Sequence, residues 1–302
     1  MCSVYRKPVV VLAKNDYAGI MWKLRCAINR HSHKYYATHI AFDRNQFNYP
    51  IEVIGDEYQS GFINQMLSEA ACIIMKDYDI PGYMLPPNIR LDPKKSIWYG
   101  VGANYRHLQA DRTFDKYRFR MVSTPDMIYR PDDIYLPAPF DTEKYIRIAD
   151  RDYDPITIMH SPSNPEQKGT NIISAAVNKI CCSYPFVHFS LTGGAPNNIV
   201  MEMKENADIF IDQIGKNQIL GYNSIEAASF GAAVVTDTSQ DNDNPAIHAS
   251  RTTLYSVLEG LVTDPSKIDA AGKEMRSWVV RTHGYRSVME LLEPYIDEIV
   301  EG

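Results

Sequence analysis

The segment from Ile156 to Val177 combines residue types that suit the binding of an anion. An apolar run ends in His160, a polar loop with Ser163 and Asn164 follows, and Lys168-Gly169-Thr170 opens a helical pattern. The start of a helix has free backbone N–H groups and a partial positive charge, so a lysine beside it is unfavourable unless an anion neutralises it. The pattern therefore predicts a site for an anionic group, with Lys168 as its main cation.

A second segment repeats this arrangement about fifty residues further along the chain. Gly221-Tyr222-Asn223 stands ahead of a short helical pattern that contains Glu226, and an apolar run over 232–236 follows. The three backbone N–H groups could bind a second phosphate, although Asn223 is an almost equally suitable helix N-cap. Two helix starts at one cleft would hold a diphosphate.

A third polar loop follows the first apolar run of the chain. Asn15, Asp16 and Gly19 separate this run from a helical pattern. Glycine lets the backbone approach a ligand closely, and Asp16 could accept a proton as a general base. The same residue types are equally typical of an ordinary strand-to-helix turn. Both interpretations of this loop stay open.

Apolar runs alternate with helical patterns along the whole chain. The runs lie at 9–13, 38–42, 73–75, 97–100, 121–123, 134–136, 156–160, 186–191, 209–211 and 232–236. Short buried strands separated by helices indicate parallel sheets and an α/β fold. A stretch rich in proline and charge interrupts the rhythm, so we expect two domains joined by a linker near 141–154.

The two phosphate-type segments resemble the C-terminal domain of GT-B glycosyltransferases, of the large retaining family that includes many bacterial and phage hexosyltransferases. Lys168-Gly169 matches the end of the family's first loop, and Gly221 and Glu226 match the glycine and the second glutamate of its other motif. Gln218 stands where the family has a first glutamate, and the arginine that usually precedes the lysine is missing around Ser163 and Asn164.

The resemblance implies a GT-B architecture, with two Rossmann-like domains whose parallel sheets face a central cleft. It implies an acceptor-side N-terminal domain over 1–142, a nucleotide-sugar domain over 143–284, and a final helix over 285–302 that packs back on the N-terminal domain. Glu226 would bind the donor ribose, and His160 would contact the donor unless it is a hydrogen-bonded structural residue. Gly193 would border the nucleotide base or form a flexible turn.

The implied activity is transfer of a sugar from a nucleotide-sugar donor to a hydroxyl acceptor, with retention of configuration. We expect no catalytic metal and no cofactor, because a lysine and helix ends can neutralise the diphosphate. Acidic pairs spaced by one residue imitate a metal motif, but four of them in one acidic chain are uninformative. These pairs are Asp77/Asp79, Asp150/Asp152, Asp152/Asp154 and Asp241/Asp243.

Two other functions stay open. The run from Tyr105 to Arg120 interleaves basic and aromatic residues, which could bind a phosphate backbone and unstacked bases. It would suit a phage-type transferase that acts on hydroxymethylated DNA bases, although such a run is more often a solvated helix face with its rings in the core. The departures at Gln218 and at the missing arginine would suit a non-catalytic protein that binds sugar nucleotides.

Composition favours a cytoplasmic protein, in the host cytoplasm if the gene belongs to a phage. No apolar stretch approaches the roughly 20 residues of a membrane span, and the N-terminal apolar run is too short for a secretory signal. The five cysteines form no CxxC pattern, which argues against a disulfide framework or a zinc site. Residues 151–302 contain 11 Lys and Arg against 20 Asp and Glu, so a phosphate site there must be made locally.

Overall fold

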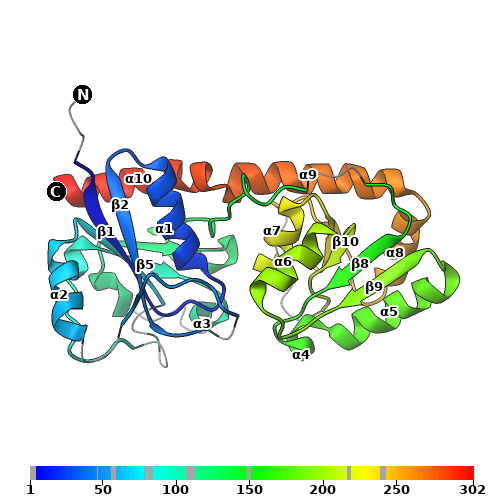
Figure 1. Ribbon diagram of the computed structural model, residues 1–302, viewed down its shortest axis with the longest axis horizontal. Helices are drawn as coiled ribbons and strands as arrows, with labels where there is room; N and C mark the ends of the chain where they lie inside the picture. Colours follow the sequence, from blue (N-terminus) through cyan, green and yellow to red (C-terminus); the bar gives the residue numbers. More distant parts are fainter. Residues whose placement is uncertain are drawn as a thin grey trace. The chain divides into compact units, whose positions relative to one another are not determined.

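The chain consists of two compact units in a computed structural model (Figure 1). One unit comprises Met1–Asp141 with His283–Gly302, and the other comprises Thr142–Thr282. The structure describes residues 5–45, 47–55, 59–77, 80, 84–106, 113–147, 151–215, 219–238 and 243–302.

The first unit is built on a seven-stranded sheet with the order β3-β2-β1-β4-β5-β6-β7, and every described strand pair in it is parallel. The strands are β1 (Lys7–Asn15), β2 (Tyr35–Asp43), β3 (Val53–Ile54), β4 (Cys72–Lys76), β5 (Ser96–Gly100), β6 (Phe119–Val122) and β7 (Asp133–Tyr135). The helices are α1 (Ile20–His31), α2 (Ser60–Glu69), α3 (Ala103–Arg106) and α10 (Tyr285–Glu301), with the 3-10 turns η2 (Pro93–Lys95), η3 (Thr113–Lys116) and η4 (Pro125–Met127).

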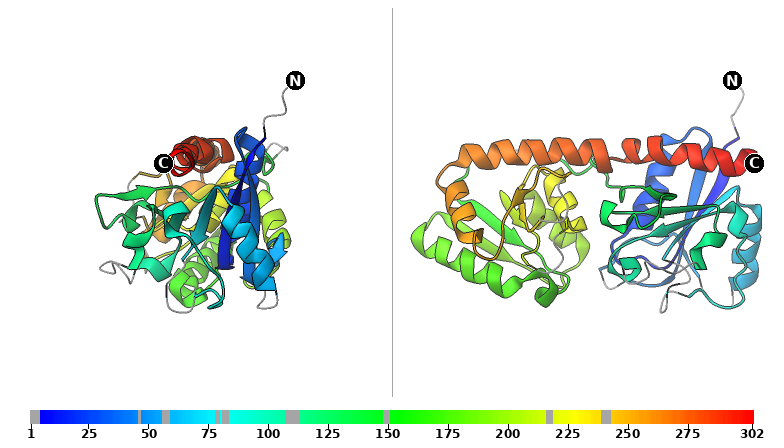
Figure 2. Two further views of the ribbon diagram at one scale, coloured as in Figure 1. Left: turned by 90° about the vertical axis from the view of Figure 1, so that its left-hand side faces the viewer. Right: turned by 180° about the vertical axis from the view of Figure 1, so that it is seen from behind.

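Helices cover both faces of this first sheet, which explains the continuous apolar runs in its strands. The α1 and α10 helices pack against one another on one face, and α2 packs on the other (Figures 1 and 2). All five residues from Val9 to Ala13 are therefore at most 2% exposed. A strand that alternated polar and apolar residues would have to bury its polar half here.

The second unit has a five-stranded parallel sheet with the order β12-β11-β10-β8-β9. Its strands are β8 (Ile156–His160), β9 (Val187–Leu191), β10 (Ile209–Ile211), β11 (Ala233–Thr236) and β12 (Ile247–His248). Its helices are α4 (Pro165–Lys168), α5 (Thr170–Ser183), α6 (Asn197–Glu205), α7 (Tyr222–Ser229), α8 (Leu254–Val262) and α9 (Pro265–His283).

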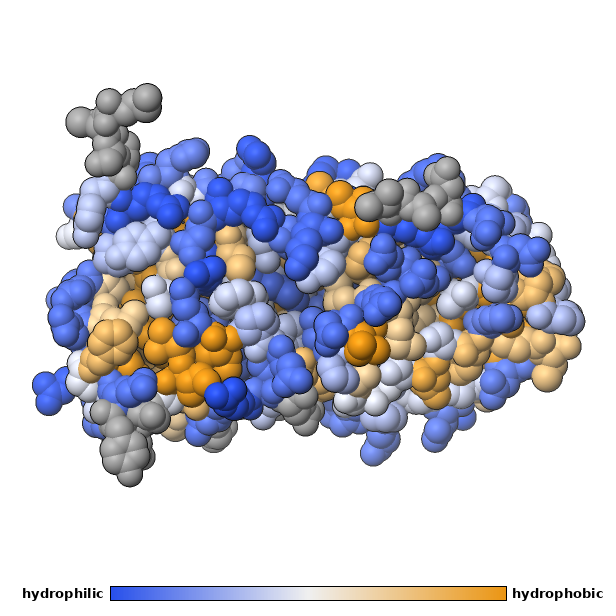
Figure 3. Space-filling model, viewed as in Figure 1, coloured by the Kyte–Doolittle hydropathy of each residue, from blue (hydrophilic) through white to orange (hydrophobic). Residues whose placement is uncertain are grey.

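Two cores flank the second sheet. Apolar residues of α5 and α8 pack on one face, and those of α6 and α7 pack on the other. Hydrophilic residues cover much of the face of each unit that Figure 3 shows, with apolar patches between them. No helix within the described residues is long and apolar enough to cross a membrane. The predicted α/β fold with parallel sheets is confirmed, and the short edge strands β3 and β12 are additions to it.

Histidine 283 ties the start of α10 to the end of the N-terminal segment within the first unit. Its Nδ1–H donates to the carbonyl oxygen of Ala138 at 2.8 Å, and its own carbonyl oxygen accepts from Phe140 N at 2.7 Å. Complete burial lowers the pKa of His283 to about 4, because the imidazolium would lose its hydration there. The ring is therefore neutral in the folded protein at pH 7.

Acid should destabilise the protein through His283. The unfolded chain takes up this proton near pH 6.5 and the folded chain only near pH 4, so the free energy of unfolding falls as the pH falls through that window. Between pH 7 and pH 5 the loss should be about 2 kcal/mol. Chemical denaturation at the two pH values measures it against His283→Asn, whose amide can still donate to Ala138. An equal pH dependence in both proteins would contradict this role.

Candidate functional site

The residues that the sequence singles out in the second unit follow the carboxyl ends of three neighbouring strands. Ser163, Asn164 and Lys168 come after β8, Gly193 after β9, and Gly221 after β10. Parallel strands present their carboxyl ends at one edge, where α/β proteins bind ligands. The loops after β8 and β10 touch there, because Ile214 N donates to the carbonyl oxygen of Lys168 at 3.2 Å.

Lys168 is the last residue of α4, and its ammonium group is held by side chains that follow β10. Its Nζ donates to Asp212 Oδ1 at 2.6 Å and to Gln213 Oε1 at 3.0 Å. The side chain is 14% exposed, and that of Asp212 is 1% exposed. The expected unpaired lysine is therefore neutralised by a buried carboxylate of the protein itself. Gly169 follows in the left-handed region, with φ of 70°, and separates α4 from the start of α5.

Gly221 completes this contact from the start of α7. Its N–H donates to Asp212 Oδ2 at 2.8 Å. A Cβ at this position would overlap Asp212 Oδ2 and lie 2.7 Å from Lys168 Nζ. Because φ is −83°, an ordinary value for any residue, the need for glycine here is one of space. The structure thus brings together the two segments that the sequence pairs, with Asp212 between them.

Glu226 and Asn223 belong to a buried network beside this contact. Lys204, which is fully buried, donates to Glu226 Oε2 at 2.5 Å and to Asn223 Oδ1 at 2.7 Å. The Asn223 amide donates in turn to the carbonyl oxygen of Ser161 at 2.8 Å. The helix N-cap of α7 is Gly221, so the alternative of Asn223 as an N-cap is wrong. The ribose-binding role of Glu226 stays a prediction.

His160 is completely buried and bridges the sheet to α5. Its Nδ1–H donates to the carbonyl oxygen of Ile211 at 2.8 Å, and the Thr170 hydroxyl donates to its Nε2 at 2.9 Å. Burial lowers its pKa, which matches a neutral ring with these two partners. The geometry favours the structural role over a donor contact.

The remaining predicted residues lie on the rim of the same edge. Asn164 caps α4, since its Oδ1 accepts from Gln167 N at 3.1 Å. Ser163 and Gly193 are exposed, and a Cβ on Gly193 would lie 3.5 Å from the carbonyl oxygen of Pro162. Tyr222 is the half-buried first residue of α7. These positions leave their ligand roles as predictions.

The loop after β1 in the first unit is a tightly packed turn. Asp16 is 1% exposed, and its Oδ2 accepts from Trp22 N in the first turn of α1 at 3.0 Å. Gly19 has φ of 63°, and a Cβ there would overlap the ring of Tyr49. Asp16 Oδ1 is buried with no hydrogen-bond partner among the described residues, as are both ring nitrogens of His39, whose Nε2 lies 3.8 Å from Asp16 Oδ2.

Lys76 and Asp77 join this loop from the end of the neighbouring strand β4. Lys76 Nζ donates to the carbonyl oxygen of Asn15 at 3.0 Å, and Asp77 Oδ1 accepts from Val101 N at 2.8 Å. Burial is the main cause that raises the pKa of Asp77 to about 6; Lys76 and the hydrogen bond from Val101 oppose this rise, and Asp16 adds a smaller increase. Lys76 and Asp77 were not singled out together from the sequence. Their position directly after the apolar run at 73–75 could have indicated them.

The other acidic pairs add little to this picture. Asp79, Asp150 and Asp241 lie outside the described residues, and in the remaining pair Asp152 Oδ1 accepts from Asp154 N at 3.4 Å. The part of the chain that the structure describes contains no group of three or more His, Cys, Asp or Glu residues placed to hold a metal ion.

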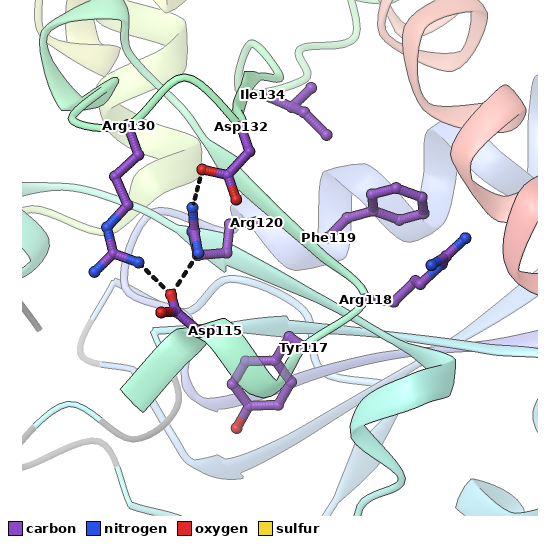
Figure 4. A pocket seen from close by; sticks show the side chains of 8 residues that line it. All are labelled: Asp115, Tyr117, Arg118, Phe119, Arg120, Arg130, Asp132 and Ile134. Atoms are coloured by element: carbon purple, nitrogen blue, oxygen red, sulfur yellow. Dashed lines mark hydrogen bonds and ion pairs between the residues drawn. The ribbon is translucent and has the colours of Figure 1, made fainter. Parts of the chain in front are cut away.

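The basic and aromatic run uses its described side chains within the first unit. Tyr105, Phe114 and Tyr117 are in or beside the core. Arg120 lies between Asp115 and Asp132 in the wall of a pocket (Figure 4). Its guanidinium donates to Asp115 Oδ1 at 2.7 Å and to Asp132 Oδ1 at 2.6 Å, and the pocket has a volume of about 630 Å³. Arg112 lies outside the described residues. The structure therefore favours the interpretation as a solvated surface with core aromatics over a DNA-binding surface.

Comparisons with solved structures identify the architecture. An α-glucosyltransferase in complex with UDP-glucose and DNA containing an abasic site is 11% identical, with a TM-score of 0.68 over 97% of this chain and 99% of that chain. HepE of Anabaena in complex with UDP and glucose is 10% identical, with a TM-score of 0.66 over 97% and 100%. A glycosyltransferase from Rickettsia africae is 9% identical, with a TM-score of 0.65 over 98% and 99%.

The chain has a GT-B fold. No protein-family model matches its sequence, and no curated protein matches it significantly. Within this fold, Lys168 and Gly221 meet at the carboxyl edge of the second sheet, and Glu226 lies about one turn further into α7. Gln218 lies outside the described residues. Asp212 and Lys204, which hold the matched residues, were not found from the sequence, because ordinary acidic and basic positions do not reveal a partner.

Gly221→Ala should destabilise the protein by about 1–3 kcal/mol, because the new methyl group has no space beside Asp212 and Lys168. Gly260→Ala is the matched control in the same unit. Nothing lies within 4 Å of a Cβ at Gly260, which is in α8, so alanine should be neutral or stabilising by about 0.5–1 kcal/mol. Thermal or chemical unfolding measures both. Equal stabilities of the two variants would contradict the crowded contact.

Proposed function

We propose that this GT-B protein is a glycosyltransferase, which binds a nucleotide-sugar through its second unit and transfers the sugar to a hydroxyl acceptor. The observation that carries the proposal is the meeting of Lys168 with the start of α7 at the carboxyl edge of the second sheet. The similar folds of proteins in complex with UDP or UDP-glucose support it. The charge and the helix end suit a diphosphate.

The chemistry that we propose depends on charge that develops on the leaving phosphate. Lys168 and the positive end of α7 would stabilise this charge, which is the usual means of lowering the barrier for such a leaving group. Positive charge from these groups makes a catalytic metal unnecessary, and we propose none and no cofactor. Glu226 would bind the ribose, from a position that Lys204 fixes.

The acceptor hydroxyl would meet the first unit at the loop after β1. Asp16 and Asp77 are buried carboxylates at the ends of adjacent strands, and Asp16 Oδ1, which has no partner within the described part of the chain, can accept a hydrogen bond. We propose retention of configuration, with the leaving phosphate taking the acceptor proton and Asp16 positioning the hydroxyl. The anomeric configuration of the product distinguishes this course from inversion with an aspartate as the base.

Lys168→Met should weaken the binding of a nucleoside diphosphate by about tenfold or more, because one charge-assisted contact is lost. Some loss of stability should accompany it, since Asp212 stays buried without its cation. Lys273→Met is the control, because Lys273 also pairs with a carboxylate, Asp269, but on an exposed part of α9. Calorimetry with UDP, ADP and GDP measures the affinities.

Donor hydrolysis and transfer, assayed with and without EDTA, complete that experiment. Activity that survives chelation supports the metal-independent course. Binding without turnover toward any acceptor would support the non-catalytic alternative, and equal affinities of wild type and Lys168→Met would remove Lys168 from the phosphate site.

DNA binding should be weak and nearly independent of salt, because arginines of the Tyr105–Arg120 run form ion pairs with carboxylates of the protein itself. Arg106 pairs with Asp126, Arg118 with Glu298, and Arg120 with three aspartates. Retention on DNA between about 50 and 200 mM salt tests this expectation. Replacing the exposed Lys116 and Arg118 by glutamine should change nothing. Tight retention that these changes abolish would instead favour a DNA acceptor.

A further inference from the structure

The carboxylate of Asp212 occupies the place at which an anionic ligand would be expected. Its two oxygens accept from Lys168 Nζ at 2.6 Å and from Gly221 N at 2.8 Å. These are the lysine and the helix start to which the donor phosphates are assigned above. One internal anion thus already satisfies both donors.

The position of this carboxylate is set by the sheet. Asp212 directly follows β10, and its backbone N–H donates to the carbonyl oxygen of Val235 at 3.1 Å. Its side chain is 1% exposed, and Gly221 provides the space that its Oδ2 fills. The carboxylate is a built part of the site and is not a mobile surface group.

Lys168 has a second acceptor within the protein, which could hold its ammonium group while an anion binds there. Gln213 Oε1 lies 3.0 Å from Lys168 Nζ and is uncharged. If the ammonium group turned from Asp212 toward a phosphate, Gln213 could keep it in the site without adding negative charge. The lysine is therefore placed for an exchange between two anions.

Asp212 reduces the positive charge that the site offers to a diphosphate. Lys168 contributes one positive charge and the start of α7 about half of one, while Asp212 contributes one negative charge. The remaining net positive charge of the site is small compared with the negative charge of a diphosphate. A carboxylate a few ångströms from bound phosphate also repels it, most strongly where water screens the two charges poorly.

We propose that Asp212 is an internal competitor of the donor phosphates, which limits the affinity for nucleoside diphosphate and promotes its release after transfer. The proposal rests on the proposed function, because it assumes that nucleotide phosphates bind at Lys168. It makes Asp212 an affinity-determining residue of the site.

Asp212→Asn tests the proposal, because the amide keeps an oxygen for one of the two donors and removes the charge. Calorimetry with UDP, ADP, GDP and inorganic pyrophosphate should give at least about tenfold tighter binding than in the wild type. In a Lys168→Met background the same change should give a much smaller gain, since the freed lysine is then absent. Asp212→Ser also removes the carboxylate, and it replaces Asp212→Asn in the same measurement if the asparagine variant does not fold.

Asp208→Asn is the matched control. Asp208 is also a buried, ion-paired aspartate of the second unit, but it precedes β10 and pairs with Arg147 and Arg151 at the opposite end of that strand. This change should leave nucleotide affinity unaltered.

Two outcomes separate the inference from the function on which it rests. If the wild type binds nucleoside diphosphate and Asp212→Asn binds it equally or more weakly, then Asp212 only positions Lys168 and the inference is overturned. If neither protein binds any of the four probes, the proposed function is overturned together with the inference.

Discussion

Both units depend on one constraint, the parallel direction of their strands. Parallel strands all end at the same edge of a sheet, so residues far apart in sequence meet there without any further device. In the second unit this edge brings Lys168, which follows β8, to Asp212 and Gly221, which follow β10. In the first unit it brings Asp16, after β1, near Lys76 and Asp77 at the end of β4. Helices on both faces bury the rest of each strand, so the polar residues of the strand ends concentrate at this edge.

Burial then governs the chemistry of these edges. A charge removed from water needs a partner, and the second unit provides one inside the fold for the buried Lys204 and for the mostly buried Lys168. Lys168 has Asp212, and Lys204 has Glu226. Burial can also shift the protonation equilibrium of a carboxyl group, as the raised pKa of Asp77 shows, even though the neighbouring Lys76 opposes that shift. Paired lysines keep a fixed direction, which favours a preorganised site, but each pair also cancels most of the field that the lysine would exert on an anion.

The strands could be predicted well from the sequence and the ion-pair partners of the site residues poorly, because strands are local in sequence and such partners are not. An apolar run that must be buried on both faces is visible in a single sequence, as at Val9–Ala13 and Ile156–His160. Gly221 was also readable, although its need for space became clear only from the side chains that surround it. The partner of Lys168 was not readable, because Asp212 is 44 residues away and only the order of β8 and β10 brings it near. The same holds for the arginines of the Tyr105–Arg120 run, whose aspartates come partly from the β6–β7 connection.

The internal pairing of Lys168 bears on which anions the site can select. A ligand with a single negative charge would gain little by replacing Asp212, because it would exchange one carboxylate-type contact for another and leave the displaced aspartate buried. A diphosphate carries more charge and several oxygens, so it can attract Lys168 and the positive end of α7 while Asp212 keeps its contact with Gly221. The Lys168–Asp212 pair therefore disfavours the binding of anions with a single charge. The ion pair lowers the affinity of the site for all anions. The loss is smallest for anions that resemble the diphosphate leaving group of a nucleotide-sugar.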